Sequence, residues 1–225
     1  MAAAFAFDII GFDLDGTLVD SSLELSASLN HALRSAGRPE IAPARVKSLV
    51  GMGAPAMLEM ALDQSGGHDR DLVKHLTTVL VDHYEANLGS DCPLFPGLLP
   101  ALDKLQLYGV TLAVVTNKFE HLAVKLLRNI GLLDQFETVI GGDSLAECKP
   151  SPMPIHEMIQ RCGGGRAAFV GDASPDIDAA RAAQIPSIAV TFGFRPDSAR
   201  ALGADSVIDH YDELDAALAR ISVGC

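Results

Sequence analysis

The chain has 225 residues, 48% of them hydrophobic and 20% charged, so it can bury a sizeable core and is expected to be folded rather than disordered. Its 17 basic and 29 acidic side chains give a net charge of −12, which argues against nucleic acid as a partner because a phosphate backbone attracts the opposite sign. A small anionic substrate is not excluded, since a metal ion and a few local cations can reverse the field inside one cleft.

The first predicted element is a buried strand over residues 9–12, which ends at Asp13. The stretch before it has no basic leader and is too short to cross a bilayer, so we interpret it as part of the fold rather than as a signal peptide or a membrane segment. Cysteines without a CxxC pair are more typical of free thiols in a reducing compartment than of disulfides. We therefore expect a cytoplasmic protein with no membrane partner. The cysteines expected to be free are Cys92, Cys148, Cys162 and Cys225.

The next part of the chain, up to about Asp91, has a helical pattern and no convincing strand. Ser21-Ser22-Leu23-Glu24 has the spacing of a capping box, and leucines at helical intervals follow it. About 70 residues of helix are too many for an ordinary crossover between strands. The sequence therefore predicts a helical cap over residues 20–91, inserted into a core made of 1–19 and 92–225. The further helices predicted in the cap span 43–50, 54–64 and 70–88.

Beyond the cap, five short apolar runs alternate with helical patterns, as is typical of parallel βαβ units. Their apolar character is continuous rather than alternating, which indicates strands covered on both faces. We therefore predict an α/β fold, a doubly wound parallel sheet that carries an inserted all-helical cap. The five runs are 111–115, 138–140, 167–170, 187–190 and, more weakly, 206–208.

Polar side chains follow three of the predicted strands at the point where each strand ends. Asp13 and Asp15 follow the first, Thr116 and Asn117 the second, and Asp172 the fourth. Any one of them alone would be an ordinary cap or turn residue. The carboxyl ends of parallel strands share one edge, however, and open α/β sheets bind ligands there. Their recurrence at this edge predicts a functional site.

The run Asp13-Leu14-Asp15-Gly16-Thr17 is the most specific of these signals. Two carboxylates this close repel one another, so their ionised forms need a cation or a shared proton. The glycine permits a tight turn, which both carboxylates need if they are to enter one cleft. Mg²⁺ suits an oxygen-only ligand set, and Asp172 can supply a further carboxylate.

Lys149 and Asp176 are additional candidates. The proline after Lys149 disfavours a helix at the lysine, which is expected in a rigid loop where its charge can stabilise a transferring phosphoryl group. Its alternative is a solvated surface lysine. Asp176 follows Pro175, where a helix can begin. It either orients Lys149 and metal-bound water or serves as an ordinary acid at a helix start.

In order and spacing, four of these segments together resemble the haloacid dehalogenase superfamily of phosphotransfer enzymes, and the resemblance covers essentially the whole chain. It implies that Asp13 attacks phosphorus to form an aspartyl-phosphate. It implies also that Asp15 protonates the departing alkoxide and then deprotonates the attacking water. The four segments are 13–20, Thr116-Asn117-Lys118, Lys149-Pro150, and Gly171-Asp172 with Asp176.

The same resemblance implies the ligands of the site. Mg²⁺ would be held by the Asp13 carboxylate, the Asp15 backbone carbonyl and Asp172. The phosphoryl oxygens would be bound by Thr116, the Asn117 backbone and Lys149, with Asp176 behind them. The inserted helices would form a mobile cap that closes over the substrate.

Three further stretches are similar to the branch of this superfamily that hydrolyses 2-phosphoglycolate, which implies a small phosphate monoester as substrate. Selectivity for it requires a cation or a helix N-terminus that faces the substrate carboxylate, and Arg45, Lys47 and the turn at residues 51–54 are candidates. Two positions depart from the pattern without removing a catalytic group: Ala173 replaces a usual serine and Gln184 a frequent glycine. The three stretches are 50–54, 141–143 with 149–152, and 190–194.

Several other functions would use the same residues. A sugar-phosphate phosphatase, a pyrophosphatase and a phosphosugar mutase are enzymatic alternatives, and a receiver-like signalling module is one from another class. A dehalogenase is disfavoured because Asp15 would have no alkoxide to protonate. A signalling switch is disfavoured because a built-in acid/base such as Asp15 would speed its hydrolysis. The chain is expected to be a monomer or a homodimer.

Overall fold

Six strands form one parallel sheet in the order β3-β2-β1-β4-β5-β6 in the computed structural model, which describes residues 5–89, 92–195 and 199–222. The first strand lies in the middle, with β2 on one side and β4 on the other. The chain therefore winds away from β1 in both directions, which confirms the predicted doubly wound sheet. The strands are β1 (Ile9–Phe12), β2 (Thr111–Val115), β3 (Thr138–Ile140), β4 (Ala167–Gly171), β5 (Ser187–Val190) and β6 (Ser206–Ile208).

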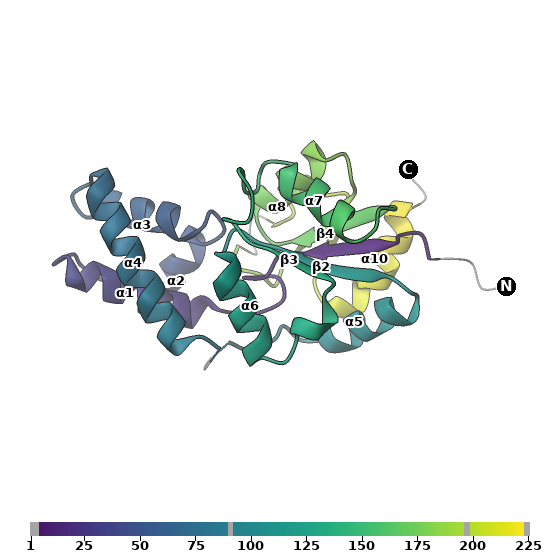
Figure 1. Cartoon of the computed structure of the whole chain (residues 1–225), viewed down its shortest axis with the longest axis horizontal. Coiled ribbons are helices and arrows are strands. Elements are labelled where there is room, and N and C mark those ends of the chain that lie inside the picture. Colours follow the sequence, from purple (N-terminus) through teal and green to yellow (C-terminus); the bar gives the residue numbers. More distant parts are fainter. Residues whose placement is uncertain (1–4, 90–91, 196–198, 223–225) are drawn as a thin grey trace.

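Side chains of the strands alternate between two buried layers, one on each face of the sheet. In β1, Ile10 and Phe12 belong to the larger layer, whereas Ile9 belongs to the smaller one. Figure 1 shows α7 and α8 on one side of the sheet and α5, α6 and α10 on the other. Cover on both faces explains why the strands are apolar throughout. These helices are α5 (Leu98–Leu107), α6 (Glu120–Asn129), α7 (Met153–Arg161), α8 (Ser174–Ala182) and α10 (Leu214–Ile221), with short 3₁₀ segments at Leu133–Gln135 and Tyr211–Glu213.

The remaining helices gather at one end of the molecule, next to the carboxyl ends of the strands (Figure 1). The long helices α1 and α4 pack against each other, and α3 packs against α4. The segment predicted as one helix over 43–50 is divided into an α-helical and a 3₁₀ turn and ends in extended backbone at Val50. We call α1–α4 the helical group. Its members are α1 (Ser22–Ser35), α2 (Pro43–Val46) with the 3₁₀ turn Lys47–Leu49, α3 (Ala54–Asp63) and α4 (Arg70–Asn87).

The two connections between the sheet and the helical group run side by side. Val19 forms an antiparallel bridge with Leu94, and the Asp20 amide donates to the Pro93 carbonyl at 2.9 Å. The chain that leaves β1 is thus tied to the chain that returns from α4. This paired connection holds the helical group over the loop that follows β1.

The predicted capping box at the start of α1 is wrong. Ser21 occupies the N-cap, but its side chain makes no capping bond. Its hydroxyl instead donates to Asp15 Oδ1 at 2.5 Å, and the Glu24 carboxylate accepts from the Gly89 amide. Ser21 is fully buried beside the Asp15 carboxylate. The hydrogen bond that its hydroxyl donates to this charged acceptor is stronger than the capping bond that it would accept from a neutral backbone amide.

Two further expectations concern the chain as a whole. Among the described helices, none combines the length and the hydropathy needed to cross a membrane. Cys92, Cys148 and Cys162 are free thiols, as predicted, whereas Cys225 lies outside the described residues.

Candidate active site

The polar residues predicted at the ends of the strands do share one edge of the sheet. The Asp13 amide donates to the Val170 carbonyl and the Thr116 amide to the Ile140 carbonyl, both at 2.9 Å. These bonds continue the backbone ladder one residue past β1 and β2. Asp13 and Thr116 therefore leave the sheet at fixed positions, facing the helical group.

The loop after β1 brings Asp13 and Asp15 to the same cavity, which both side chains line. Gly16 makes the tight turn, with a φ of +89° that other residues rarely adopt. A side chain at Gly16 would also collide with Asp172, because a Cβ there would lie 2.4 Å from Asp172 Oδ2. Glycine is thus required at this position both for the turn and for the approach of the loop to Asp172.

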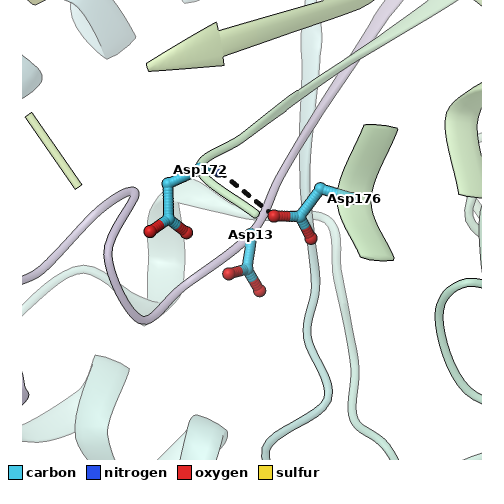
Figure 2. A group of neighbouring side chains, drawn as sticks. All are labelled: Asp13, Asp172 and Asp176. Atoms are coloured by element: carbon cyan, nitrogen blue, oxygen red, sulfur yellow. Dashed lines mark hydrogen bonds between the residues drawn. The ribbon is translucent and has the colours of Figure 1, made fainter. Parts of the chain in front are cut away.

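Three buried carboxylates meet behind this cavity. Asp13, Asp172 and Asp176 each place an oxygen within 4.8 Å of the others (Figure 2). Burial, together with the neighbouring negative charges, raises the pKa of Asp13 to about 6 and the pKa of Asp172 well above its ordinary value of 3.8. A cluster of this kind calls for positive charge, because buried acids remain ionised only when they are paired or bind a cation.

Lys149 supplies part of that charge. Its ammonium donates to Asp13 Oδ1 at 2.8 Å, to Asp176 Oδ1 at 2.7 Å and to the Val115 carbonyl at 2.6 Å. The side chain is 2% exposed, so the alternative of a solvated surface lysine is wrong. All three ammonium hydrogens are directed to protein oxygens. A contact from Lys149 to a phosphoryl oxygen stays a prediction.

Asp176 both contacts Lys149 and lies in the first turn of a helix, the two alternatives that the sequence left open. One oxygen accepts from Lys149, and the other accepts from the amides of Asp172 and Ala173 at 3.1 and 3.0 Å. It therefore closes the start of α8 and orients the lysine at once. Ala173, the departure noted in the sequence, is the N-cap of α8 and offers no side-chain capping bond.

The acid cluster fits a small hard cation. Asp176 has both oxygens engaged, whereas Asp13 and Asp172 each accept on one oxygen only, and ligation of a metal by these two carboxylates stays a prediction. Asp172 accepts one backbone bond, from Phe194 at 2.8 Å. Space around it is kept by glycine, since a Cβ at Gly193 would lie 2.4 Å from the Asp172 side chain. Oxygen ligands in a tight, buried cradle suit Mg²⁺.

Thr116 and Asn117 also line the cavity. Thr116 Oγ1 accepts from the Lys118 amide at 3.2 Å. The Asn117 side chain donates to the Lys149 carbonyl at 2.9 Å and to the Gly51 carbonyl, in the helical group, at 3.0 Å. Asn117 thus connects the loop after β2 with the turn that precedes α3. Phosphoryl binding by Thr116 and the Asn117 backbone stays a prediction.

Two residues of the site were not predicted. Lys118 donates to both oxygens of Asp15, at 2.8 and 2.7 Å, and lies 4.5 Å from the centre of the Tyr84 ring. Ser21 donates to the same carboxylate. Lys118 belongs to the Thr-Asn-Lys segment, but nothing in that spacing indicates that its side chain turns back toward the loop after β1. For Ser21, the sequence pattern predicts a helix cap instead.

The cationic candidates for substrate selection are placed elsewhere. Arg45 bonds the Gln64 side chain at the exposed surface, and Lys47 pairs with Asp20 at 3.3 Å. Neither lines the cavity, whereas Gly51, Gly53 and Ala54 of the turn before α3 do.

The chain is similar to characterised families over nearly all its length. The family of haloacid dehalogenase-like hydrolases matches residues 10–190. A phosphoglycolate phosphatase from Mesorhizobium japonicum is 37% identical over 215 residues, 94% of each chain. Another, from Agrobacterium fabrum, is 40% identical over 211 residues, 92% of this chain and 90% of the relative. The crystal structure of a predicted phosphoglycolate phosphatase from Haemophilus somnus has a TM-score of 0.86 at 31% identity and covers 93% of this chain and 96% of that one.

The doubly wound sheet, the paired aspartates after β1 and the buried acid cluster together define a hydrolase whose site lies at the carboxyl edge of a parallel sheet. The match over most of the length makes the assignment specific: the chain belongs to the haloacid dehalogenase-like hydrolases. It is an enzyme, and the relatives to which it is similar are phosphatases.

Proposed function

We propose that the chain is a magnesium-dependent phosphatase that hydrolyses a small phosphate monoester through Asp13. One observation carries this proposal. Asp13 and Asp15 line one cavity, and Lys149 holds Asp13 from behind by a bond of 2.8 Å. A nucleophile fixed in place beside a separate acid is the arrangement that covalent phosphoryl transfer requires.

The reaction has two balanced steps. In the first, a carboxylate oxygen of Asp13 bonds to phosphorus while the bond from phosphorus to the ester oxygen breaks, and Asp15 gives its proton to the departing alkoxide. In the second, Asp15 takes a proton from water, which attacks phosphorus and releases phosphate from Asp13. Lys118 and Ser21 orient the Asp15 side chain, and because Lys118 donates to both of its oxygens, this geometry is that of the ionised Asp15, the form that takes the proton in the second step.

The metal would be held by the carboxylates of Asp13 and Asp172 and by the backbone carbonyl of Asp15. When bound, it supplies positive charge that stabilises the negative charge on the transferring phosphoryl group. Thr116 and the Asn117 backbone, which line the same cavity, bind the phosphoryl oxygens. Lys149 keeps the nucleophile aligned and adds to the positive field.

We propose 2-phosphoglycolate as the substrate. The names of the curated relatives support this choice. The composition of the cavity supports it too. Its walls include Leu25, Val50, Met57 and Leu80, which cannot hydrogen-bond the hydroxyls of a sugar. A sugar-phosphate phosphatase or a phosphosugar mutase is accordingly less well supported.

We infer further that the helical group, residues 20–91, is a cap that excludes water from the cavity. Its apolar side chains form part of the wall, and Asn117 ties its turn to the phosphate side. A cytoplasmic location accords with free thiols at Cys92, Cys148 and Cys162.

A substrate panel with a variant tests the proposal. With Mg²⁺ present, kcat/KM should be highest for 2-phosphoglycolate among sugar phosphates, nucleotides and pyrophosphate. Asp13→Asn should fold normally and release no phosphate from any of them. A preference for another ester would refute the substrate, and phosphate release by Asp13→Asn near the native rate would refute the nucleophile.

A further inference from the structure

Lys118 is a buried cation. In the two reaction steps its one role is to orient the side chain of Asp15. Its side chain is 5% exposed and lines the cavity. Among the described residues that line this cavity, it is the single basic one. Apart from the polar residues Asp13, Asp15, Thr116 and Asn117, the cavity wall is formed by glycine, aromatic and aliphatic groups, including Tyr84 and Leu122. A cation in such surroundings produces a strong local field, because the low dielectric screens it weakly.

The position of Lys118 relative to the reacting ester follows from its partner. It lies 2.7 and 2.8 Å from the two oxygens of Asp15. To protonate the leaving oxygen, Asp15 must come within roughly 2.6–3.2 Å of it. The ammonium is therefore one hydrogen bond away from the group that contacts the ester oxygen.

A substrate can reach this ammonium only with an atom close to its own ester oxygen. In 2-phosphoglycolate a single methylene separates the ester oxygen from the carboxylate carbon. The carboxylate then falls within hydrogen-bond reach of the Lys118 ammonium while Asp15 contacts the ester oxygen. An ester whose charged group is several atoms farther away would place it among the apolar walls.

The helical group contributes to the same side of the cavity. The helix α3 begins there, and its N-cap, Gly53, has no side chain to cap the first-turn amides. The positive end of the helix dipole adds to the attraction for an anion near Lys118. The two cations proposed from the sequence, Arg45 and Lys47, do not line the cavity, so Lys118 is the one available.

We propose that Lys118 is the specificity-determining residue of this site and that its ammonium receives the carboxylate of the substrate, or another anionic group attached one carbon from the ester oxygen. The inference rests on the proposed phosphatase function. It differs from a purely structural role, in which Lys118 would only hold Asp15 and would matter equally for every ester.

The test compares two esters of similar size, 2-phosphoglycolate and 2-hydroxyethyl phosphate, in which a hydroxymethyl group replaces the carboxylate. The measured quantity is the ratio of their kcat/KM values. In Lys118→Met this ratio should fall about 10- to 100-fold relative to the parent enzyme, the loss expected for one charged hydrogen bond. Lys118→Arg, which keeps the charge, should restore part of it.

Two further variants complete the design. Lys125→Met removes another lysine at the border of the helical group, paired with Glu85 at 2.9 Å and 40% exposed, and should leave the ratio unchanged. Lys118→Gln keeps a donor for Asp15 but has no charge. In this variant the ratio of the two kcat/KM values should fall as it does in Lys118→Met. The variant also serves as the test if Lys118→Met does not fold.

The outcomes separate the two proposals. A parent enzyme that prefers 2-phosphoglycolate, with a ratio that drops in both neutral variants, supports both. A parent enzyme with this preference and neutral variants that lose both activities equally leaves the substrate in place and overturns the role of Lys118. A parent enzyme that treats the two esters alike overturns both.

Discussion

Lys149 and Asp176 form an ion pair of 2.7 Å in which each side chain is 2% exposed. The lysine comes from the loop before α7 and the aspartate from the first turn of α8, and the pair joins these two segments behind Asp13. With Asp13 and Asp172 added, the buried cluster has three carboxylates and one ammonium. Lys149 is therefore central to the charge balance of the folded protein as well as to the alignment of the nucleophile.

Removal of the Lys149 charge should destabilise the protein strongly. Lys149→Met leaves three buried carboxylates without their cation, and breaking a buried pair in this way costs about 3–5 kcal/mol. Urea unfolding at neutral pH, followed by circular dichroism because the chain has no tryptophan, measures the loss. The control is Lys104→Met, whose lysine pairs with Asp215 at 50% exposure and should lose less than about 1 kcal/mol. Equal losses in the two variants would contradict the buried-pair argument.

Magnesium should stabilise the folded protein through the same cluster. A ligand that binds only the folded state raises stability with its concentration, by about 2.7 kcal/mol at 100 times its dissociation constant. The melting temperature should therefore rise with added Mg²⁺ after EDTA treatment. Asp172→Asn, which removes a proposed ligand, should abolish the rise, while the exposed Asp209→Asn should keep it. A rise of the same size in the Asp172 variant would exclude this carboxylate as a ligand.

In the metal-free protein, Asp13 should make stability depend on pH. Burial raises its pKa from 3.8 to about 6, so between these values the folded state binds more protons than the unfolded state. The free energy of unfolding then falls as the pH rises through this window. Asp13→Asn has no carboxylate to titrate at this position, so it does not lose this part of the stability. The stability of the variant relative to the parent should increase by about 1 kcal/mol between pH 5 and pH 7.5. Urea unfolding in EDTA at the two pH values measures it; a constant or decreasing difference would contradict the raised pKa.

Much of the fold and the meeting of Asp13 with Asp172 could be predicted from the sequence. Every strand was placed correctly, with β4 one residue longer than expected. The reason is physical: strands buried on both faces are continuous apolar runs, and parallel strands put the residues after them at one edge. Asp13 and Asp172 follow such strands directly, so their meeting required only the sheet.

Contacts that depend on how the helical group sits over the sheet were not predictable in this way. Lys118 follows β2 by three residues, and its ammonium, which bonds Asp15, lies over the ring of Tyr84 from α4, a contact that depends on the helical group. Ser21 has the composition of a helix cap, but the curl of the loop after β1 offers it a carboxylate. Arg45 and Lys47 precede the turn at residues 51–54 by a few residues, but their side chains bond Gln64 and Asp20 and do not line the cavity.

Gln184, which stands where glycine is frequent in the family pattern, has a strained backbone, and its replacement should stabilise the protein. It follows the C-terminus of α8 with a φ of +59°, the only positive φ outside glycine among the described residues. The Ile185 amide bonds back to the Ala180 carbonyl at 3.1 Å, which closes the helix end around this left-handed residue. A left-handed residue with a side chain costs about 1–2 kcal/mol, which glycine avoids at some cost in chain entropy. Gln184→Gly should therefore gain about 0.5–1 kcal/mol in urea unfolding.

The same substitution elsewhere provides the matched control. Gln160 is exposed within α7, where the backbone has ordinary helical geometry. There glycine only loses helix propensity, so Gln160→Gly should lower stability by about 0.5–1 kcal/mol. Opposite signs for the two glutamines would show that the left-handed backbone, rather than the change of side chain, is responsible. A loss of stability in Gln184→Gly would mean that contacts of the glutamine side chain outweigh its strain.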